Sequence, residues 1–172
     1  MVGAGLFSDA LVARAGALIA RCREQGVRIA LAESCTGGLV CALLTEIPGS
    51  SAVLERGFVV YSNQAKQDLL GVSAATLAEF GAVSAETARE MALGALARSP
   101  AHVALSITGI AGPDGGTAQK PVGLVHFGCA RRGGGVTPRE RRFGAIGRAA
   151  IRLAAVATAL EMLEGAVSTL IR

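Results

Sequence analysis

Residues 27–39 read VRIALAESCTGGL, and this stretch predicts a buried strand that turns directly into a helix. Residues 27–32 are apolar except for one Arg and follow Gly26, a pattern typical of a strand inside a sheet. Residues 39–47 then carry apolar side chains at helical spacing. The polar cluster between the two, residues 33–38, therefore lies at a strand-to-helix turn.

Helical and strand-like patterns alternate on both sides of this turn. We expect helices over residues 9–25, 63–70 and 148–171, and two more that begin after Ser73 and Ser84. We expect further strands over residues 57–62, 102–108, 122–130 and 136–143. The last of these is expected at an edge of the sheet, because its charged and apolar side chains alternate. Because helices before, between and after strands require a sheet covered on both faces, the sequence predicts an α/β fold. We expect a single domain over residues 1–172, built as a three-layer α/β/α sandwich with a mixed, mostly parallel sheet.

The composition is that of a packed domain, since 51% of the 172 residues are hydrophobic and 17% are charged. No apolar run reaches the roughly 18 residues of a membrane-spanning helix, and no basic leader precedes the first apolar run. We therefore expect a cytoplasmic protein with no membrane partner. The four cysteines form no CxxC pair and have no His at zinc-finger spacing, so we expect reduced, mostly buried thiols and no metal site.

The net charge of +4 does not predict nucleic-acid binding. The densest basic cluster, within residues 131–142, is interrupted by glycines and by Glu140, and aromatic residues make up only 3% of the chain. A solvated hairpin explains this cluster better than attraction to phosphates does. All but two of the 17 basic residues are Arg, the exceptions being Lys66 and Lys120. Since Lys can lose its proton and Arg cannot, either a lysine is kept as a base or the two are present by chance.

The turn after the first strand is where an α/β sheet opens toward a ligand. Ser34 stands in this turn, followed by Thr36, Gly37 and Gly38. Their backbone amides have no partner within the following helix, so they can hold an oxyanion or a phosphate. Ser34 is therefore either a helix cap or a nucleophile.

A nucleophilic serine needs a neighbouring base. The two histidines, His102 and His126, fall within expected strands, which disfavours a Ser-His-Asp triad. Lys66 follows the second strand, and burial that lowers its pKa from about 10.4 toward about 7 to 8 makes a lysine a base. Tyr61 either relays a proton to this group, donates a hydrogen bond, or fills a core or capping position. Glu33 either orients the lysine or satisfies the end of the helix.

A second candidate segment begins where the strand over residues 102–108 ends. Residues 109–120 are rich in Gly and Pro, so their backbone can approach a ligand closely. The segment lacks the Lys-Ser or Lys-Thr ending of a nucleotide P-loop and does not match GxGxxG. It is therefore either a binding loop or a simple turn.

Four longer stretches together are specific enough to suggest a family. They are LAESCTGG at 31–38, PGSSAVLERGFVVYSNQAKQDLLGV at 48–72, GAVSAETAREMA at 81–92 and SITGIAGPDGGTAQKPVGLVHFG at 106–128. In this order they closely resemble the CinA C-terminal domain family and cover nearly the whole chain. The chain departs from the family where members often have Gly-Asp-Arg, since Gly147-Arg148 lacks the acid. Larger members also carry an N-terminal domain that resembles molybdopterin-binding proteins, so the resemblance implies a stand-alone form.

The resemblance implies a nicotinamide-nucleotide amidase, which hydrolyses the carboxamide of nicotinamide mononucleotide to nicotinate mononucleotide and ammonia in pyridine nucleotide recycling. Ser34 falls on the family's nucleophile and Lys66 on its base, while Tyr61 and Thr108 also fall on family positions. The chemistry implied passes through an acyl-enzyme and needs no cofactor, and a homo-oligomer is expected because members associate. The residues expected to bind the substrate are Glu33, Thr36, Gly37, Gly38, Thr108, Gly109, Gly112 and Arg148.

Two other functions fit the same residues. One is a non-catalytic module that holds a nucleotide with the glycine loop and the helix start, within a larger assembly. The other is an enzyme with Cys35 as the nucleophile, although the sequence shows no partner beside Cys35 that would stabilise a thiolate.

Overall fold

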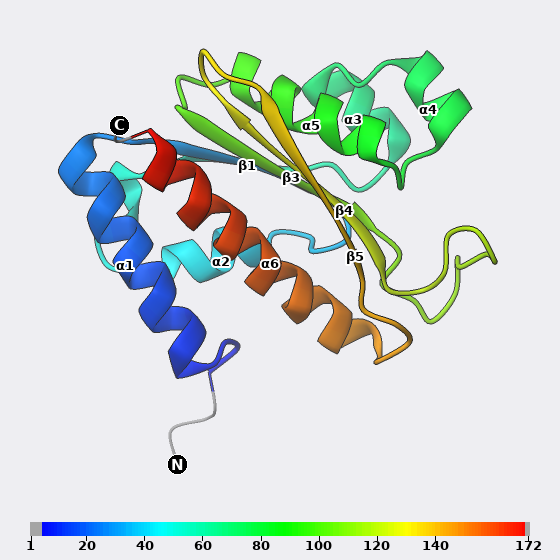
Figure 1. Cartoon of the computed structure of the whole chain (residues 1–172), viewed down its shortest axis with the longest axis horizontal. Coiled ribbons are helices and arrows are strands. Elements are labelled where there is room, and N and C mark those ends of the chain that lie inside the picture. Colours follow the sequence, from blue (N-terminus) through cyan, green and yellow to red (C-terminus); the bar gives the residue numbers. More distant parts are fainter. Residues whose placement is uncertain (1–4, 171–172) are drawn as a thin grey trace.

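A computed structural model describes residues 5–170 and contains a five-stranded sheet in the order β2-β1-β3-β4-β5 (Figure 1). The strands are β1 (Ile29–Glu33), β2 (Leu54–Val59), β3 (Val103–Gly109), β4 (Leu124–Arg131) and β5 (Val136–Arg142). β1 pairs in parallel with β2 and with β3, whereas β4 pairs antiparallel with β3 and with β5. All strands except β4 therefore run in one direction, which confirms the mixed, mostly parallel sheet.

Helices cover both faces of this sheet, so the predicted three-layer sandwich is confirmed (Figure 1). On one face lie α1 (Asp9–Gln25), α2 (Leu39–Thr45) and α6 (Arg148–Thr169). On the other face lie α3 (Asn63–Leu70), α4 (Ala74–Phe80) and α5 (Ala85–Ala97). α5 packs directly on the strands, and α3 and α4 pack on α5. A short 3-10 helix, Ser50–Ala52, lies between α2 and β2.

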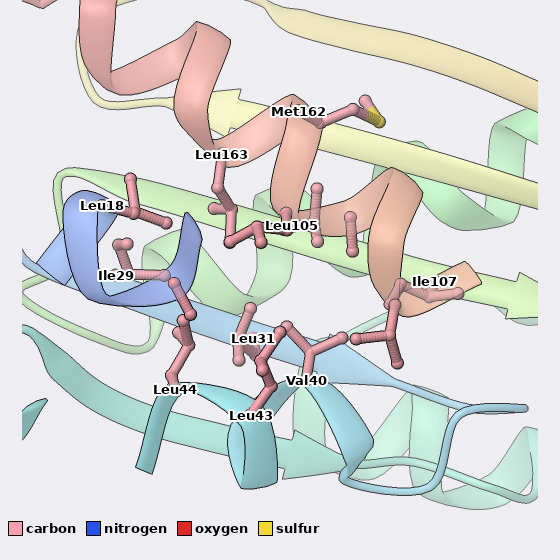
Figure 2. Close-up of a cluster of buried hydrophobic side chains, with 14 of the residues drawn as sticks. Leu18, Ile29, Leu31, Val40, Leu43, Leu44, Leu105, Ile107, Met162 and Leu163 are labelled. Carbon is pink, nitrogen blue, oxygen red and sulfur yellow. The ribbon is translucent and has the colours of Figure 1, made fainter. Parts of the chain in front are cut away.

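β1 separates the two hydrophobic layers of the core, and each of its residues is buried. Successive side chains of a strand point to opposite faces of the sheet. Ile29 and Leu31 accordingly belong to the layer beneath α1, α2 and α6 (Figure 2), while Ala30 and Ala32 belong to the layer beneath α5. Burial of each of the two larger side chains stabilises the fold by about 1.5–3 kcal/mol. By the same alternation Glu33, the last residue of β1, points to the α2 side.

The helix ends follow the predicted capping residues more closely than the strand ends follow their patterns. The hydroxyls of Ser8, Ser73 and Ser84 each accept a hydrogen bond from the backbone amide three residues later. Gly26 ends α1 in the left-handed conformation, with φ 65°. β2 begins at Leu54, earlier than the predicted residue 57, because this edge strand is only partly buried and its polar residues hide the strand pattern.

The first two turns of the last helix, α6, lie at the ends of the parallel strands. α6 begins at Arg148, as predicted, and ends at Thr169, while Ile171, the predicted last residue, lies outside the described residues. It packs on β3 and β4, and its first residue hydrogen-bonds to the segment that follows β3. Over residues 5–170 no helix combines the length and the apolar character needed to cross a membrane.

Candidate active site

Ser34 and Lys66 meet at the edge of the sheet where the parallel strands end. Ser34 directly follows β1, and its backbone amide donates to the carbonyl of Ile107 in the neighbouring strand β3, with a distance of 3.0 Å. The Nζ atom of Lys66 lies 3.1 Å from the Oγ atom of Ser34. The exposed fraction is 8% for Ser34 and 1% for Lys66. The predicted neighbours, which lie far apart in sequence, are therefore in hydrogen-bond contact and almost sealed from solvent.

The surroundings of Lys66 suit a neutral amine. Its Nζ atom donates to the carbonyls of Val60 and Tyr61, at 2.9 and 3.3 Å. As an ammonium, Lys66 donates its third N–H to the Oγ atom of Ser34; in the neutral amine the two N–H groups stay on the carbonyls and the lone pair faces Ser34. Burial lowers the pKa of Lys66 below its ordinary value, because removing the ammonium from water disfavours the charged form. The site can thus hold a general base next to a hydroxyl.

The position of this lysine follows from the local sequence. Ser62 begins α3 by accepting a hydrogen bond from the backbone amide of Ala65. This cap places Lys66 in the first turn of the helix, close to the end of β2. The side chain then reaches across the end of the sheet to the turn after β1.

Neither a thiol nor a histidine takes the place of this pair. Burial raises the pKa of Cys35 to about 11, so its thiol stays protonated near neutral pH. His102 lies just before β3 and accepts a hydrogen bond from the backbone amide of Arg28, at the opposite end of the strand. His126 lies within β4 and is not part of the cavity beside Ser34.

Glu33 resolves one of the open alternatives, because its carboxylate binds the start of α2 and not the lysine. The side chain is fully buried and accepts hydrogen bonds from the backbone amides of Gly38, Val40 and Cys41, at 3.0, 3.1 and 2.9 Å. A carboxylate is favoured there by the unpaired amides and by the positive end of the helix. The protein therefore fills the start of α2 with its own anion.

The predicted role of the helix-start amides is consequently wrong for two of the three residues. The amide of Gly38 is taken by Glu33, and the amide of Gly37 donates to the carbonyl of Ser34, at 3.0 Å. Neither is free for a ligand oxygen. The amide of Thr36, by contrast, donates to no other residue within the described part of the chain.

A cavity of about 270 Å³ opens beside Ser34. The predicted residues that line it are Ser34, Tyr61, Lys66, Thr108, Gly109, Gly112 and Arg148. The predicted residues that do not line it are Glu33, Thr36, Gly37 and Gly38. The cavity is also lined by Cys35, the alternative nucleophile, and by residues that the sequence reasoning did not assign to the site: Ala82, Val83, Ile110, Ala111, Asp114 and Gly115. Asp114 could have been found as the acid of the glycine loop, whereas the apolar residues carry no chemical signal.

Hydrogen bonds connect three of the segments that line the cavity: the glycine loop, the residue Tyr61 after β2, and the start of α6. Arg148 donates from Nη1 to the carbonyl of Gly112, at 2.8 Å, and from Nη2 to the hydroxyl of Tyr61, at 3.1 Å. Tyr61 is 62% exposed, so it fills no core position. Thr108 donates from its hydroxyl to the carbonyl of Ala82, at 2.7 Å, which holds the segment before α5 against β3. The glycine loop, the tyrosine and the start of α6 therefore form one connected wall.

The glycines of the loop are also required by packing. A Cβ atom at Gly109 would lie 2.8 Å from the carbonyl oxygen of Leu124. Gly112 has φ 77°, a conformation that other residues rarely adopt, and a Cβ there would lie 2.6 Å from Val122. The loop is thus both a structured turn and a wall of the cavity. Across residues 5–170, no cluster of His, Cys, Asp and Glu side chains is suited to a metal ion.

Known proteins share both the sequence and the shape of this chain. The family model for the CinA C-terminal domain matches residues 4–167. The nicotinamide-nucleotide amidohydrolase PncC of Escherichia coli K12 is 52% identical over 142 residues, which cover 82% of this chain and 85% of that protein. The PncC amidohydrolase of Enterobacter agglomerans is 51% identical over 139 residues, which cover 81% and 84%. A CinA-like protein of Geobacter sulfurreducens is 51% identical, but the match covers 83% of this chain and only 34% of that longer protein.

Solved structures agree with the sequence comparisons. The crystal structure of the competence/damage inducible protein CihA from Agrobacterium tumefaciens has a TM-score of 0.93 and 54% identity, and the match covers 96% of this chain and 99% of that one. A CinA superfamily protein from Escherichia coli has a TM-score of 0.85 and 33% identity, with 92% of each chain covered. The fold is therefore shared over almost its full length.

Proposed function

The chain belongs to the CinA C-terminal domain family, and on that premise we propose that it is an amidohydrolase for nicotinamide mononucleotide. Hydrolysis of the carboxamide yields nicotinate mononucleotide and ammonia. Ser34 is the nucleophile and Lys66 is its base. The observation that carries this proposal is the 3.1 Å contact between the two side chains, with the remaining hydrogen-bond directions of the amine used by two carbonyls.

The contact defines the first half of the reaction. The neutral amine of Lys66 takes the proton of Ser34 while Oγ forms a bond to the carboxamide carbon. The ammonium then gives that proton to the amide nitrogen of the tetrahedral intermediate, the C–N bond breaks, and ammonia leaves. The product of this half is an ester between Ser34 and the nicotinoyl group.

The second half regenerates the enzyme. Lys66, neutral again, takes a proton from water while the water oxygen attacks the ester carbon. Return of the proton to Oγ breaks the ester and releases nicotinate mononucleotide. No step needs a metal or an organic cofactor, because the one group that must gain and lose a proton is already a base of lowered pKa.

The substrate assignment draws on the relatives and on the cavity. Two proteins that match this chain over most of their own length are named nicotinamide-nucleotide amidohydrolases. The cavity carries an arginine, Arg148, whose Nε donates to no residue in the described part of the chain and suits the phosphate. Asp114 is an acceptor on the same wall and suits the hydroxyls of the ribose. We propose in addition that the enzyme is a cytoplasmic homo-oligomer whose residues 1–172 form a single amidase domain.

Release of ammonia from nicotinamide mononucleotide by the purified protein tests this function. We expect steady turnover, with the ammonia matched by an equal amount of nicotinate mononucleotide. Hydroxylamine added during turnover should attack the acyl-enzyme and give the hydroxamate of nicotinate mononucleotide, detectable by mass spectrometry. Binding of the nucleotide with no ammonia released would contradict the proposal and support the non-catalytic module.

A further inference from the structure

Thr108 is the neighbour of Ser34 on the adjacent parallel strand. β1 and β3 pair with Glu33 opposite Ile107, and the ladder continues with the hydrogen bond from the amide of Ser34 to the carbonyl of Ile107. The next pair in this register is Ser34 and Thr108, on strands that are about 4.8 Å apart. Residues opposite each other in neighbouring strands point to the same face of the sheet. Both residues also line the same cavity.

The contacts of the two side chains agree with this placement. Ser34 is hydrogen-bonded to Lys66 of α3, and Thr108 is hydrogen-bonded to Ala82, just before α5. Both partners belong to the layer of helices on the same face of the sheet. The exposed fraction of Thr108 is 1%. Its hydroxyl is therefore a nearly sealed polar group in the part of the cavity that holds the nucleophile and its base.

The hydrogen bond to Ala82 determines what this hydroxyl can offer a substrate. A hydroxyl has one hydrogen to donate and two lone pairs that accept, whereas a carbonyl can only accept. The single hydrogen of Thr108 is therefore committed to the carbonyl of Ala82, at 2.7 Å. Within residues 5–170 no N–H or O–H group donates to its lone pairs. Toward the cavity Thr108 is thus an acceptor and not a donor.

An acceptor in this position distinguishes the substrate from the product. A carboxamide carries two N–H groups, whereas an ionised carboxylate carries none and only accepts. The lone pairs of Thr108 can hold the carboxamide nitrogen, but beside a carboxylate oxygen they stay unpaired. A site built to hydrogen-bond an N–H group rejects an analogue that lacks it, because the buried polar group then has no partner.

We propose that Thr108 is a specificity-determining residue, which accepts a hydrogen bond from the carboxamide nitrogen and thereby favours the amide over its acid product and over esters. The inference rests on the proposed function, since it assumes attack of Ser34 on a carboxamide. A Thr108 with only a structural role would hold Ala82 in place and would treat amides and esters alike.

A pair of substrates tests the direct contact. Nicotinamide mononucleotide and the methyl ester of nicotinate mononucleotide give the same acyl-enzyme, but the ester has no N–H group. Thr108→Val removes the hydroxyl and keeps the shape, so kcat/KM for the amide should fall about three- to tenfold more than kcat/KM for the ester. The loss of the bond to Ala82 affects both substrates and cancels in this ratio. Thr108→Ser keeps the hydroxyl and should keep the ratio of the wild type.

Ser106 provides the matched control, because it lies two residues earlier on the same face of β3. Its hydroxyl donates to the carbonyl of Ala88 in α5, and its side chain is fully buried outside the cavity. Ser106→Ala should lower the free energy of unfolding, because the same kind of hydrogen bond is lost. The ratio of amide to ester turnover should stay unchanged.

A second readout measures binding without turnover. In the acetylpyridine analogue of the nucleotide a methyl group replaces the amino group of the carboxamide, so the shape is kept and the N–H groups are lost. Ser34→Ala, which cannot form an acyl-enzyme, should bind nicotinamide mononucleotide about three- to tenfold more tightly than this analogue. Adding Thr108→Val should make the two affinities equal, and titration calorimetry measures both.

The failure of the inference and the failure of the proposed function give different results. If the wild type hydrolyses both substrates and Thr108→Val lowers both by the same factor, the inference alone is wrong. Where Thr108→Val does not fold, Ser34→Ala decides by itself, since equal affinities for the nucleotide and the acetylpyridine analogue would overturn the inference. A wild type that hydrolyses neither substrate refutes the proposed function, and one that hydrolyses only the ester refutes both.

Discussion

The two halves of the sheet treat polar side chains in opposite ways. At the ends of the parallel strands β1 and β3, the side chains of Glu33, Ser34 and Lys66 are buried. Glu33 accepts hydrogen bonds from backbone amides at the start of α2, and Lys66 is hydrogen-bonded to Ser34. In the antiparallel hairpin β4–β5, Arg139 and Arg142 lie near the surface and pair with Glu161 and Glu140. Both halves carry polar and ionisable side chains, but only the parallel half buries them.

This difference teaches where to look for chemistry. Exposed ion pairs typically contribute between about 0 and 1 kcal/mol, so they are easily gained and lost. A buried lysine destabilises the fold unless its amine is neutral and its N–H groups are hydrogen-bonded. A lysine in such a position therefore indicates a functional role for the side chain. The basic hairpin, which dominates the charge of the chain, is the less informative half.

The largest effect should come from the nucleophile in the buried half. Ser34→Ala removes the atom that forms the acyl-enzyme, and we expect kcat to fall by about 10⁴-fold or more. Steady-state release of ammonia measures this loss. Cys35→Ala is the matched control next in sequence and should retain a sizeable part of the activity, because its thiol stays protonated. The reverse pattern would show that the cysteine is the nucleophile.

The base should give the next largest effect. Lys66→Arg keeps a positive charge but cannot lose a proton, so we expect a folded protein with kcat lowered by about 10³-fold. Lys120→Arg is the control, since the other lysine donates to the carbonyl of Phe80. Near-normal turnover in Lys66→Arg would show that charge alone suffices.

The same residue sets the sign of the pH dependence. Lys66 is active as the neutral amine, so kcat/KM should rise as the pH increases through its pKa. Because burial lowers this pKa, the midpoint of the rise should lie below the ordinary lysine value of about 10.4. A pH profile of kcat/KM between pH 5 and pH 10 checks this, and a flat profile would contradict the base role.

Removal of the phosphate from the substrate should have an intermediate effect. A charge-assisted hydrogen bond is worth about 1.5–3 kcal/mol, so the riboside should have a kcat/KM about ten- to a hundredfold below that of the nucleotide. Free nicotinamide should be poorer still. In Arg148→Ala the nucleotide and the riboside should become more alike, and an undiminished preference for the nucleotide would place the phosphate elsewhere.

Glu33 tests the stability of the buried half instead of its chemistry. Glu33→Gln removes the charge that accepts three backbone amides, and we expect the free energy of unfolding to fall by about 1–3 kcal/mol. Glu46→Gln at the exposed far end of α2 is the control and should change it by less than about 0.5 kcal/mol. Urea denaturation measures both values. Equal stability of the two variants would mean that the buried carboxylate is not an anchor.

The smallest effect should come from the hairpin. Arg139→Ala breaks the 2.7 Å ion pair with Glu161, which is partly exposed on both sides. We expect a loss of less than about 1 kcal/mol, smaller still at high salt, and no change in kcat. A drop in kcat comparable to that of Lys66→Arg would erase the contrast between the two halves.

From the residues alone Ser34 was either a helix cap or a nucleophile and Lys66 a candidate base after the second strand, and the resemblance to the CinA C-terminal domain family implied that the two act together. The sequence left the role of Glu33 open because the predicted strand ended at residue 32. With Glu33 inside β1, the alternation of side chains directs it to the face of α2 and away from Lys66. The hydrogen bonds from Arg152 to the carbonyls of Cys35 and Thr36 had no signal at all, since no periodicity relates a residue on the last helix to the turn after the first strand.

The contacts of Arg148 reduce the conformational entropy that its side chain loses when it binds an anion. A long, flexible side chain normally loses conformational freedom when a ligand immobilises it, at about 0.5–1.5 kcal/mol. Here Gly112 and Tyr61 already restrict the guanidinium in the absence of a ligand. That ordering occurs once, during folding, and is not repeated at each binding event. The saving corresponds to about a two- to tenfold gain in affinity, which a lysine at this position, without the rigid fork, would not provide.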